Sequence, residues 1–581
     1  MINVSQEYKS FCESTVRPKS YIVVKYGALD KSSKGKYQSY DSSNIQEFAS
    51  PKKLFDEIKN TNYKYISCEP NRVKLDDSFR FINNSSKKND NETIAYWSKT
   101  ISNENGLFEN NPTILITFDD LVALGDITFY FEDICKSFTL TFYNETNAIY
   151  TETISDNDKL TYIFNPSTSN RGLQFNIIKL EFISTNTAYR AIKLSEMDFG
   201  DYQTFTSSQI VDYNIIEELS LDGSELSSNS LNLSLDNSNG EFDVLNPRSK
   251  LYLLQEKQEI SIFHNMQLPN KVYEIPLGKF LINNAYANGS TLDIEAYDNI
   301  YFMNDLYYGS DLYVNKSCYD ILLELFNYFN YFNFEIDDIA KEIQLSGYIP
   351  IVSFREALRF ICEASCLNIK TNRNGYTKIF KINSGDGGKI FRRALIFSET
   401  PNKDLATTSI DVKEYDYTTE EEKATIYEGS FLASDEEYII PFNQSPIKPS
   451  TLVIDGTNDD FVITNRYATS CTIKVTKDTN IKLKATLIKP KVISGVKQGN
   501  VNSNTNFFTV DNPLITKSNS SKVKEWKARN NKIRYSFKTN LMPYIELGDK
   551  CYYQTKFNTL NNFIINKLEF TKSILQDIEG E

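Results

Sequence analysis

Residues that could act as catalytic nucleophiles, acid–base groups or metal ligands are few and scattered along this chain. The 581 residues include one histidine, His264, which lies in the strand-like segment ISIFHNM. A catalytic triad and a zinc site both need several side chains that converge on one point, so a lone histidine predicts a structural role. The cysteines form neither a disulfide framework nor a CxxC metal motif, and their scatter is typical of a reducing compartment. They stand at positions 12, 68, 135, 318, 362, 366, 471 and 551.

Two glycine-containing segments are similar to ligand-binding loops, but a simple turn explains each of them better. SGDGGKI at 384–390 lacks the Gly-x4-Gly-Lys-Ser/Thr pattern of a phosphate loop because isoleucine follows the lysine, which favours a flexible turn. DNSNGEFD at 236–243 has Pro247 where a calcium loop needs a bidentate glutamate, which favours a hairpin turn.

Two pairs of neighbouring residues also have structural interpretations. Asp119 and Asp120 would point to opposite faces of a strand and could share a ligand only where the strand has ended, so a strand-ending turn is favoured. Cys362 and Cys366 would lie on one helix face, where buried small residues are favoured over metal ligands. We therefore predict no catalytic residue, no cofactor and no metal site. A glycosidase, which needs only two carboxylates, stays an open alternative.

Aromatic residues supply the remaining candidates for binding. Tyr96, Trp97 and Tyr189 could form a sugar-stacking platform, although aromatic residues of a sandwich more often fill its core. Trp526, together with Val523, could anchor an interface, although the core-facing stripe of a short helix is the default interpretation.

Composition limits the classes of partner. The formal net charge of −13 disfavours binding to a nucleic-acid backbone, which depends on clustered lysine and arginine. The first residues, MINVSQEYKSFCES, are polar and predict no signal peptide. No segment approaches the ~20 apolar residues of a membrane span. Runs rich in tyrosine, phenylalanine and isoleucine, separated by asparagine, glycine and serine, predict a mainly β protein.

The segment 207–304 shows the clearest strand pattern. Leu231, Leu233 and Leu235 alternate with polar residues, as in a half-buried strand. The same alternation recurs at Ile260, Ile262, Leu292, Ile294 and Ala296. Asn239-Gly240 supplies the positive φ values of a tight hairpin. We expect antiparallel strands that close into a barrel or pair with another copy.

A small α+β module follows at 310–382. Ser317 is a predicted N-cap, and Ser353 with Glu356 forms a predicted capping box. Between the two caps, apolar residues recur at helical spacing at positions 318, 321, 322, 325, 326 and 329. Asn374-Gly375 predicts a hairpin.

The later part returns to strands. Residues 409–417, 425–431 and 481–487 are among those predicted for 400–490, with TEEEK at 419–423 as a solvated loop or helix start. A helix is predicted at 521–529 and a strand at 533–538.

The N-terminal part is predicted to be a β-sandwich, because short strands recur between residues 113 and 183. The segments AYWS at 95–98, NGLFENNPTILITFDD and AYRAIKLSEMDFGD resemble an accessory jelly-roll domain of tail proteins from phages of Gram-positive hosts. That domain is similar to galactose-binding or discoidin-type sandwiches.

Three segments in order resemble the central hub proteins of phage tails and contractile injection systems. The first is the barrel candidate, which closes with Gly278, Phe280, Ala296 and Asp298. The second is the helix SFREALRFICEAS. The third contains Asn512-Pro513-Leu514-Ile515, the helix with Trp526, and PYIELGD with Gly548 and Asp549. The resemblance covers roughly 207–581 and is weakest at 400–490.

These observations predict a mainly β, multidomain protein with hub-type β-barrels, a jelly-roll sandwich and a small α+β insert. The expected order is an N-terminal arm (1–30), a galactose-binding-like sandwich (31–205), hub barrel 1 (206–308), an α+β insert (309–400), a β domain (401–490) and hub barrel 2 (491–581).

The resemblance implies a non-enzymatic baseplate protein that joins the tail tube to the tip as a homotrimer, in a virion or tail-like particle assembled in the bacterial host cytoplasm. It implies contacts with the tail tube protein, baseplate wedge proteins and a tail tip or spike protein. The alternative hypothesis is a host-recognition protein that binds cell-wall glycans through residues 31–205. Neither hypothesis includes nucleic acid or a membrane span.

Overall fold

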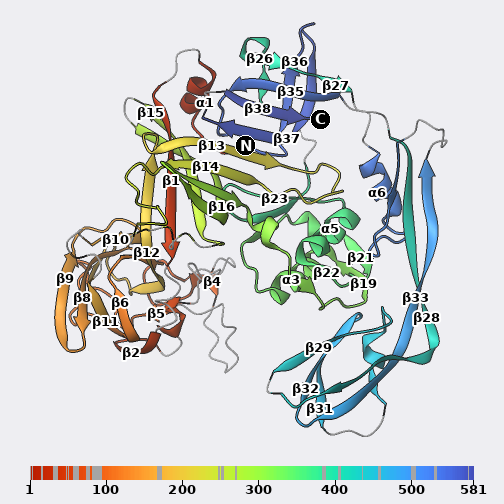
Figure 1. Ribbon diagram of the computed structural model, residues 1–581, viewed down its shortest axis with the longest axis horizontal. Coiled ribbons are helices and arrows are strands. Elements are labelled where there is room, and N and C mark those ends of the chain that lie inside the picture. Colours follow the sequence, from red (N-terminus) through yellow and green to blue (C-terminus); the bar gives the residue numbers. More distant parts are fainter. Residues whose placement is uncertain are drawn as a thin grey trace. The chain divides into compact units, whose positions relative to one another are not determined.

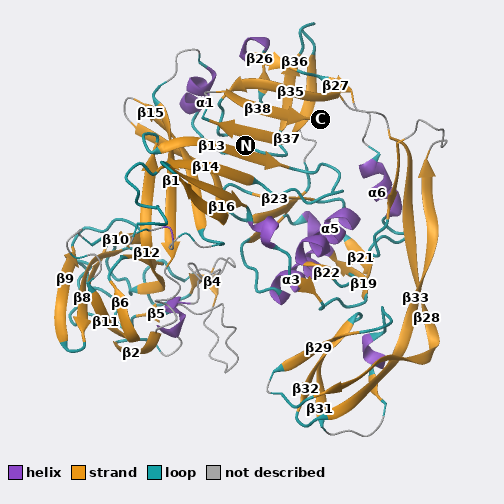
Figure 2. Cartoon of the chain, in the orientation of Figure 1, coloured by secondary structure: helices purple, strands orange, loops and turns teal. Residues whose placement is uncertain are grey.

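The computed structural model describes residues 2, 4–14, 18–29, 37–46, 49, 51–55, 64–73, 79–80, 95–166, 170, 173–246, 249, 251, 254, 256–268, 271–382, 388–403, 407–434, 436–455, 460–498, 506–528, 533–572 and 575–581. The chain forms two compact units. The first comprises Met1–Val24, Phe205–Leu251 and Glu259–Glu581, and the second comprises Lys25–Thr204 and Tyr252–Gln258. Strands predominate over helices, which confirms the predicted mainly β, multidomain fold (Figure 2).

The second unit is a β-sandwich. One sheet has the antiparallel order β2 (Tyr37–Ser43), β6 (Thr113–Ala123), β11 (Gln174–Thr185), β8 (Cys135–Asn144) and β9 (Asn147–Ile154). The other sheet contains β10 (Thr161–Phe164), β7 (Asp126–Phe131), β12 (Lys193–Thr206) and β5 (Tyr96–Trp97). Phe129, Phe138 and Phe182 from the two sheets are fully buried in one core. Two short strands, β3 (Lys64–Tyr65) and β4 (Phe79–Arg80), pair in parallel.

The strand β6 corrects one prediction. It continues through Asp119 and Asp120, so the strand-ending turn expected there is absent. The pairing of β6 with β11 shifts register at this point, because Thr117 pairs with Ile177 whereas Val122 pairs with Phe175. The two aspartates therefore lie in a bulge, which interrupts the ladder without ending the strand.

A continuous antiparallel sheet runs through the first unit. Its order is β15 (Glu259–Leu268), β16 (Lys271–Asn288), β17 (Thr291–Tyr297), β14 (Ser230–Asp236), β13 (Ile210–Glu218), β37 (Leu560–Thr571), β38 (Leu575–Gly580) and β35 (Ile533–Asn540). Leu231, Leu233 and Leu235 are at most 2% exposed, as the period-2 pattern predicts.

Smaller strands extend the C-terminal end of this sheet. β36 (Lys550–Gln554) forms a hairpin with β37, and β25 (Ile390–Phe391) pairs in parallel with β36. β26 (Ile396–Glu399) and β27 (Asn402–Lys403) pair with β35.

The pairing of β13 with β37 joins the two predicted barrel modules. The ladder runs from Asn214 opposite Thr571 to Glu218 opposite Lys567. The strand pattern predicts sheets that close into a barrel or pair with another copy, and at this edge the partner strand comes from the same chain. The two modules thus share one backbone hydrogen-bond ladder.

The turn at Asn239-Gly240 also differs from its prediction. Gly240 has a φ of +68°, as expected, and its N–H donates to the carbonyl of Asn237. However, β15 begins only at Glu259, and β14 pairs with β13 and β17. The predicted tight hairpin is therefore a chain of successive turns that leaves the sheet.

The α+β insert contains the predicted helices and hairpin. Its elements are β18 (Leu306–Tyr307), β19 (Tyr313–Ser317), α3 (Cys318–Tyr328), β20 (Phe334–Ile336), α4 (Ile339–Glu342), β21 (Gln344–Gly347), β22 (Val352–Ser353), α5 (Phe354–Ser365), β23 (Asn368–Thr371) and β24 (Thr377–Phe380). Ser317 Oγ accepts the N–H of Asp320, and Ser353 Oγ accepts the N–H of Glu356, so both predicted N-caps form.

A long two-stranded ribbon follows the insert (Figure 1). It consists of β28 (Thr407–Phe431) and β33 (Thr479–Gln498). The segment 419–423 lies inside β28, so the predicted loop is instead a register shift between Thr419 and Lys423. Because β33 pairs with β28 on both sides of this shift, the strand continues through the acidic residues.

The ribbon carries a small module between its strands. A three-stranded sheet of β29 (Glu437–Pro441), β32 (Ser470–Val475) and β31 (Phe461–Arg466) follows β28, and β30 (Val453–Ile454) pairs with β33. Near its base, β34 (Asn506–Val510) pairs in parallel with β28, and α6 (Ser520–Lys527) follows.

At the N-terminus lie α1 (Gln6–Glu13) and β1 (Ser20–Leu29). Among the helices of the described residues, none has the length and hydropathy that crossing a membrane requires.

Candidate functional site

The tip of the hairpin between β23 and β24 carries Arg373. Asn372 Oδ1 accepts the backbone N–H groups of Asn374 and Tyr376, both at 3.0 Å. Gly375 has a φ of +85°, and a Cβ there would lie 2.7 Å from the Cδ of Lys279. The backbone conformation therefore favours glycine at this position. This rigid turn fixes the position from which the Arg373 side chain extends.

Arg373 connects three parts of the first unit. Its guanidinium donates to both carboxylate oxygens of Glu217 on β13, at 2.8 and 2.9 Å. It also donates to the carbonyl of Ile545 at 2.7 Å and to that of Pro543, within the PYIELGD segment. The ring of Phe570 on β37 lies 5.1 Å from its Cζ atom. The insert, the first β module and the C-terminal module therefore meet at one side chain. We call these five residues the Arg373 junction.

The Arg373 junction is shielded from solvent. Arg373 is 5% exposed and Glu217 is 4% exposed. Burial alone would lower the pKa of Arg373, but the charge and hydrogen bonds of Glu217 raise it, with Glu546 and Asp549 adding to the effect. A fork-to-fork pair of this kind is strong and directional. Loss of one partner would leave the other charge buried and unpaired.

Polar side chains of β23 extend the same contact. Lys370 Nζ donates to the carbonyl of Leu547 at 2.7 Å. Asn368 Nδ2 donates to the carbonyls of Ser220 and Leu221 at 3.0 and 3.1 Å. Because these acceptors are backbone groups, the contact fixes chain position and does not depend on the identity of the residues that supply them.

Asp298, one of the predicted hub-motif residues, is fully buried at the end of β17. Its carboxylate accepts the N–H of Ile300, which caps a short 3₁₀ helix (Asn299–Phe302), and the N–H of Asn229 at 2.8 Å. Burial raises its pKa to about 6, although these hydrogen bonds act in the opposite direction. It is a structural cap and not a solvent-facing acid.

Asn512 and Pro513 form a second buried contact. Asn512 Nδ2 donates to the carbonyl of Phe360 and to Glu363 Oε2, at 2.9 and 3.1 Å. Its Oδ1 accepts the N–H of Leu514, which closes the turn. The Pro513 carbonyl accepts the hydroxyl of Tyr417 on β28. The NPLI turn thus connects α5 with the ribbon.

Glu363 is the charged centre of this second contact. It pairs with Lys527 of α6 at 2.6 Å and with Arg359 of its own helix at 3.2 Å. Glu363 and Lys527 are both buried. Together with Asn512, they fasten α6 to α5.

Trp526 and Gly548 are set by close packing. Trp526 is buried, and a Cβ on Gly223 would lie 2.5 Å from its ring, so this tryptophan fills the core. Gly548 has a φ of +81°, and a Cβ there would lie 3.1 Å from Phe380. Asp549 Oδ2 accepts the N–H of Glu546 at 2.8 Å.

The other motif glycine acts within β16. A Cβ on Gly278 would lie 2.4 Å from the ring of Phe280, which is buried. The glycine is therefore needed for this phenylalanine to lie along its own strand.

The lone histidine contacts the N-terminal helix. His264 is buried, and its Nδ1 lies 3.3 Å from the hydroxyl of Tyr8 in α1. Tyr8 is fully buried against Tyr273 and Tyr544, with ring centroids 5.4 and 6.4 Å away. The helix thus contacts both β modules. The structural role of the histidine stays a prediction.

The predicted sugar-stacking residues lie in different environments. Tyr96 is fully buried and stacks on Phe182, and Trp97 is 4% exposed beneath Lys193. Tyr189 is 42% exposed. The three rings do not share a solvent-facing surface, because two of them fill the interior of the sandwich.

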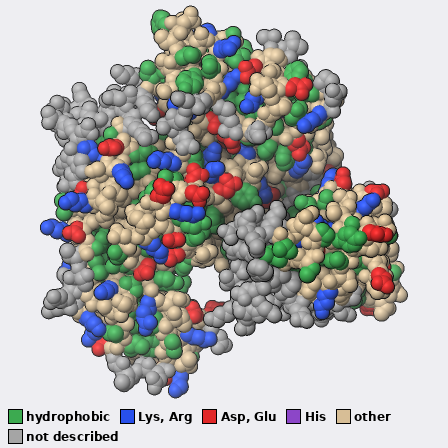
Figure 3. Space-filling model, turned by 180° about the vertical axis from the view of Figure 1, so that it is seen from behind, with side chains coloured by type: hydrophobic (Ala, Val, Ile, Leu, Met, Phe, Trp, Pro, Cys, Tyr) green, Lys and Arg blue, Asp and Glu red, His purple; other side chains and the backbone are tan. Residues whose placement is uncertain are grey.

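The remaining sequence candidates give no assembled site. Cys362 is buried, burial raises the pKa of its thiol, and Cys366 is the left-handed C-cap of α5. Residues 384–387 of the SGDGGKI segment lie outside the described residues. Within the part of the chain that the structure describes, no group of three or more His, Cys, Asp or Glu residues could hold a metal ion. Acidic and basic side chains are interspersed on the face shown in Figure 3.

Four buried charged residues could not be recognised from the sequence: Arg373, Glu217, Glu363 and Lys527. Arg373 lies in the polar segment TNRNG, which is typical of an exposed turn. No sequence pattern around Arg373 distinguishes this buried arginine from a solvent-exposed one.

Comparisons with known proteins give structural likeness only. No protein-family model matches the sequence. No curated protein matches it either. Among solved structures, the chain is similar to a 43 kDa tail protein of prophage MuSo2 from Shewanella oneidensis, with 9% identity and a TM-score of 0.35. The match covers 65% of this chain and 94% of that one.

A tail protein from Neisseria meningitidis matches with 8% identity and a TM-score of 0.36, over 65% of this chain and 93% of that one. A component of the Escherichia coli type VI secretion system, described as similar to T4 bacteriophage tail proteins, matches with 7% identity and a TM-score of 0.30. That match covers 64% of this chain and 73% of that one.

Proposed function

We propose that this chain is a structural baseplate hub protein that joins the tail tube to the tip of a phage or phage-tail-like particle. The observation that carries the proposal is the fusion of two β modules through β13 and β37, locked at the Arg373 junction. A hub transmits force between its neighbours, and a shared ladder with a buried ion pair resists separation of the modules. Three residues of the predicted hub motifs, Asp298, Asn512 and Trp526, are buried at other contacts within the first unit, which supports the same proposal.

The proposed hub is a homotrimer. Identical subunits that close a ring satisfy all their interfaces without open ends. Light scattering coupled to size exclusion, with the full chain at micromolar concentration, should give three times the monomer mass. A strictly monomeric protein, both alone and in imaged particles, would contradict the trimer.

The proposed partners are the tail tube protein, baseplate wedge proteins and a tip or spike protein. Co-expression with the neighbouring reading frames should yield a complex in which the trimer binds tube protein at one end. The proposed role is assembly and not turnover, so incubation with purified cell wall should release no soluble fragments.

Glycan binding by residues 31–205 stays a second prediction. Because Tyr96 and Trp97 are buried, Tyr189 is the one residue of the predicted set that a ligand could reach. Pull-down of the full chain on host cell walls, compared between wild type and Tyr189→Ala, tests this prediction.

A further inference from the structure

An amine and an amide meet at one buried carboxylate between α5 and α6. Glu363 Oε1 lies 2.6 Å from Lys527 Nζ, and Glu363 Oε2 accepts a hydrogen bond from Asn512 Nδ2 at 3.1 Å. The same carboxylate therefore holds the primary amine of the lysine beside the primary amide of the asparagine. An unprotonated amine is a nucleophile and an amide carbon is an electrophile, so the two groups have the chemistry to form a covalent bond.

The Asn512 amide is fixed in orientation. Its Oδ1 accepts the backbone N–H of Leu514 at 3.0 Å, and its Nδ2 also donates to the carbonyl of Phe360 at 2.9 Å. When a nucleophile attacks the amide carbon, negative charge develops on the oxygen, and a backbone N–H aimed at that oxygen stabilises the charge. Leu514 thus supplies an oxyanion donor to the amide.

These groups are shielded from solvent. Asn512 is 0% exposed, Lys527 is 2% exposed and Glu363 is 3% exposed. Leu514 and Val523 belong to the apolar core beside them. Because burial penalises charged groups, it favours proton transfer from the ammonium to the carboxylate, which leaves both groups neutral. The same burial keeps out the water that would otherwise compete for the amide.

A second cation also binds this carboxylate. Arg359 lies 3.2 Å from Glu363 Oε2. A guanidinium does not give up its proton in proteins, whereas an ammonium can. Of the two cations, only Lys527 can therefore become a nucleophile.

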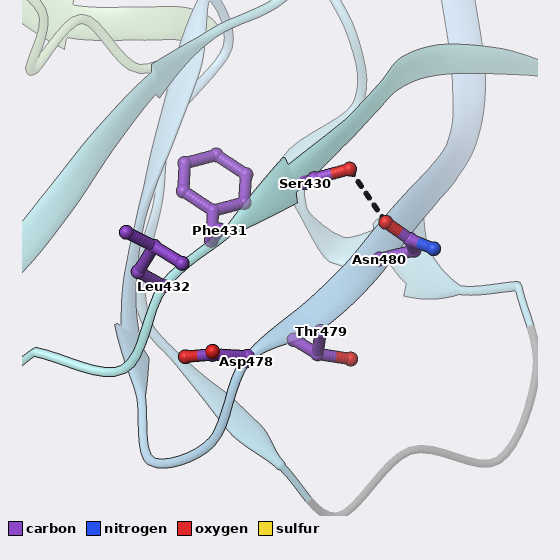
Figure 4. A pocket seen from close by; sticks show the side chains of 6 residues that line it. All are labelled: Ser430, Phe431, Leu432, Asp478, Thr479 and Asn480. Atoms are coloured by element: carbon purple, nitrogen blue, oxygen red, sulfur yellow. Dashed lines mark hydrogen bonds between the residues drawn. The ribbon is translucent and has the colours of Figure 1, made fainter.

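Polar side chains at the far end of the ribbon do not converge in this way (Figure 4). Ser430 Oγ donates to Asn480 Oδ1 at 2.6 Å, and Phe431 and Thr479 form the neighbouring pair of the ladder. Neighbouring pairs of a ladder point to opposite faces, so these four side chains do not act on one group. The contact at Glu363 differs because its polar groups share one carboxylate.

We propose that Lys527 and Asn512 form an intramolecular isopeptide bond, with Glu363 as the catalytic acid–base residue. Glu363 takes a proton from the Lys527 ammonium, and the neutral Nζ attacks Cγ of Asn512. The Glu363 carboxylic acid passes this proton to Nδ2, the Cγ–Nδ2 bond breaks, and ammonia leaves. Glu363 then takes the extra proton from the new amide nitrogen and releases it with the ammonia as ammonium. The reaction forms one Nζ–Cγ bond and needs no oxidant or cofactor.

The cross-link closes a covalent loop from Asn512 to Lys527, with α6 inside it. Tension between β34 and β35 then passes through the side-chain amide, and α6 does not have to bear it. The proposal does not depend on the hub function, because it uses only buried contacts of the first unit.

Mass spectrometry of the purified full chain tests the proposal. We expect the wild-type mass to fall short of the sequence mass by one ammonia molecule, and a tryptic digest to contain a branched peptide that joins Asn512 to Lys527. Lys527→Arg keeps the charge but removes the nucleophile, so it should show neither change. The matched control Lys522→Arg replaces an exposed lysine of the same helix and should retain both.

Glu363→Gln removes the acid–base group. Loss of such a group slows proton-transfer steps by about 10²–10⁴-fold, so this variant should carry little cross-link when freshly purified. Circular dichroism checks that each variant is folded, and the wild-type measurement decides the proposal even if a variant is not. Three results would overturn it: folded wild-type protein without the branched peptide, an unchanged loss of ammonia in Lys527→Arg, or full cross-linking in freshly purified Glu363→Gln.

Discussion

The guanidinium of Arg373 is bound by one carboxylate and two backbone carbonyls from different parts of the chain. Arg373→Ala would leave Glu217 charged and buried, so we expect a loss of about 3–5 kcal/mol in the free energy of unfolding. Urea denaturation of the purified protein measures this loss. The double variant Arg373→Met with Glu217→Leu should recover part of it, because no buried charge is then left unpaired.

The ion pair between Lys341 and Asp338 supplies the matched control. It lies on the surface, with side chains 55% and 89% exposed. Lys341→Ala should leave the urea midpoint unchanged. Equal effects of the Arg373 and Lys341 variants would show that the Arg373 junction does not hold the modules together.

Asp298 predicts a specific pH dependence. Burial raises its pKa to about 6 in the folded protein from 3.8 in the unfolded chain, so the folded state binds more protons between these values. The contribution of Asp298 to stability is therefore full below pH 4 and falls by about 3 kcal/mol as the pH rises to 6. The difference in free energy of unfolding between wild type and Asp298→Asn should decline over this range and then level off. A constant difference from pH 4 to 7 would contradict the assignment.

Residues that act locally were predictable from the sequence, and those that act at a distance were not. Ser317 and Ser353 cap helices that begin one residue later, so their spacing carries the signal. Arg373 and Glu217 are separated by 156 positions, and no local pattern connects them. The burial of Tyr96 and Trp97 could not be predicted, because the sequence does not distinguish the aromatic residues of a binding platform from those of a core.

At the scale of elements, the contact between Gly223 and Trp526 predicts that substitutions at these two positions have coupled effects on stability. Gly223→Ala would place a Cβ 2.5 Å from the indole ring in a backbone conformation with a φ of +63°. We expect a loss of about 1–3 kcal/mol in the free energy of unfolding from overpacking. In a Trp526→Ala background the steric part should disappear, so the two losses should be less than additive. Strict additivity, measured by denaturation of all four proteins, would exclude the contact.

The packing of Tyr8 in helix α1 predicts that Tyr8→Phe and Tyr8→Ala lower the free energy of unfolding by different amounts. Tyr8→Phe removes the contact with His264 and should cost about 1 kcal/mol. Tyr8→Ala leaves a cavity between Tyr273 and Tyr544 and should cost about 3–5 kcal/mol, the usual range for a large aromatic residue. Limited proteolysis should then cut the N-terminal segment faster in the alanine variant than in the phenylalanine variant. Equal rates in all three proteins would show that α1 is not held by this side chain.

Elements with strong periodicity matched their predictions, whereas the ribbon did not. The apolar stripe of α3 is buried as expected, because helical spacing fixes which side chains share a face. The acidic segment 419–423 has little strand propensity, yet β33 pairs with the residues on either side of it. Tertiary pairing outweighs local preference at such a place. The boundary expected at residue 490 likewise falls inside β33.

At the scale of the whole molecule, the ladder between β13 and β37 removes one strand edge that another copy of the chain could have paired with. Separate barrels would each present unpaired strands, which favours pairing with another copy. The chain pairs one of these edges internally, so the proposed trimer must be built on other surfaces. The oligomeric mass of Glu217→Gln should therefore equal that of the wild-type protein, provided that the variant folds. A monomeric but folded variant would place this part of the chain in the subunit interface.

The same ladder sets an order of events during synthesis. Asn214 lies opposite Thr571 and Glu218 lies opposite Lys567 in this ladder, so β13 can pair with β37 only after the ribosome has synthesised these later residues. Until then β13 presents free backbone donors and acceptors, to which other nascent chains can add. A truncated polypeptide that ends before residue 560 lacks β37, so the edge of β13 stays exposed. We expect such a fragment to aggregate or to be degraded by cellular quality control.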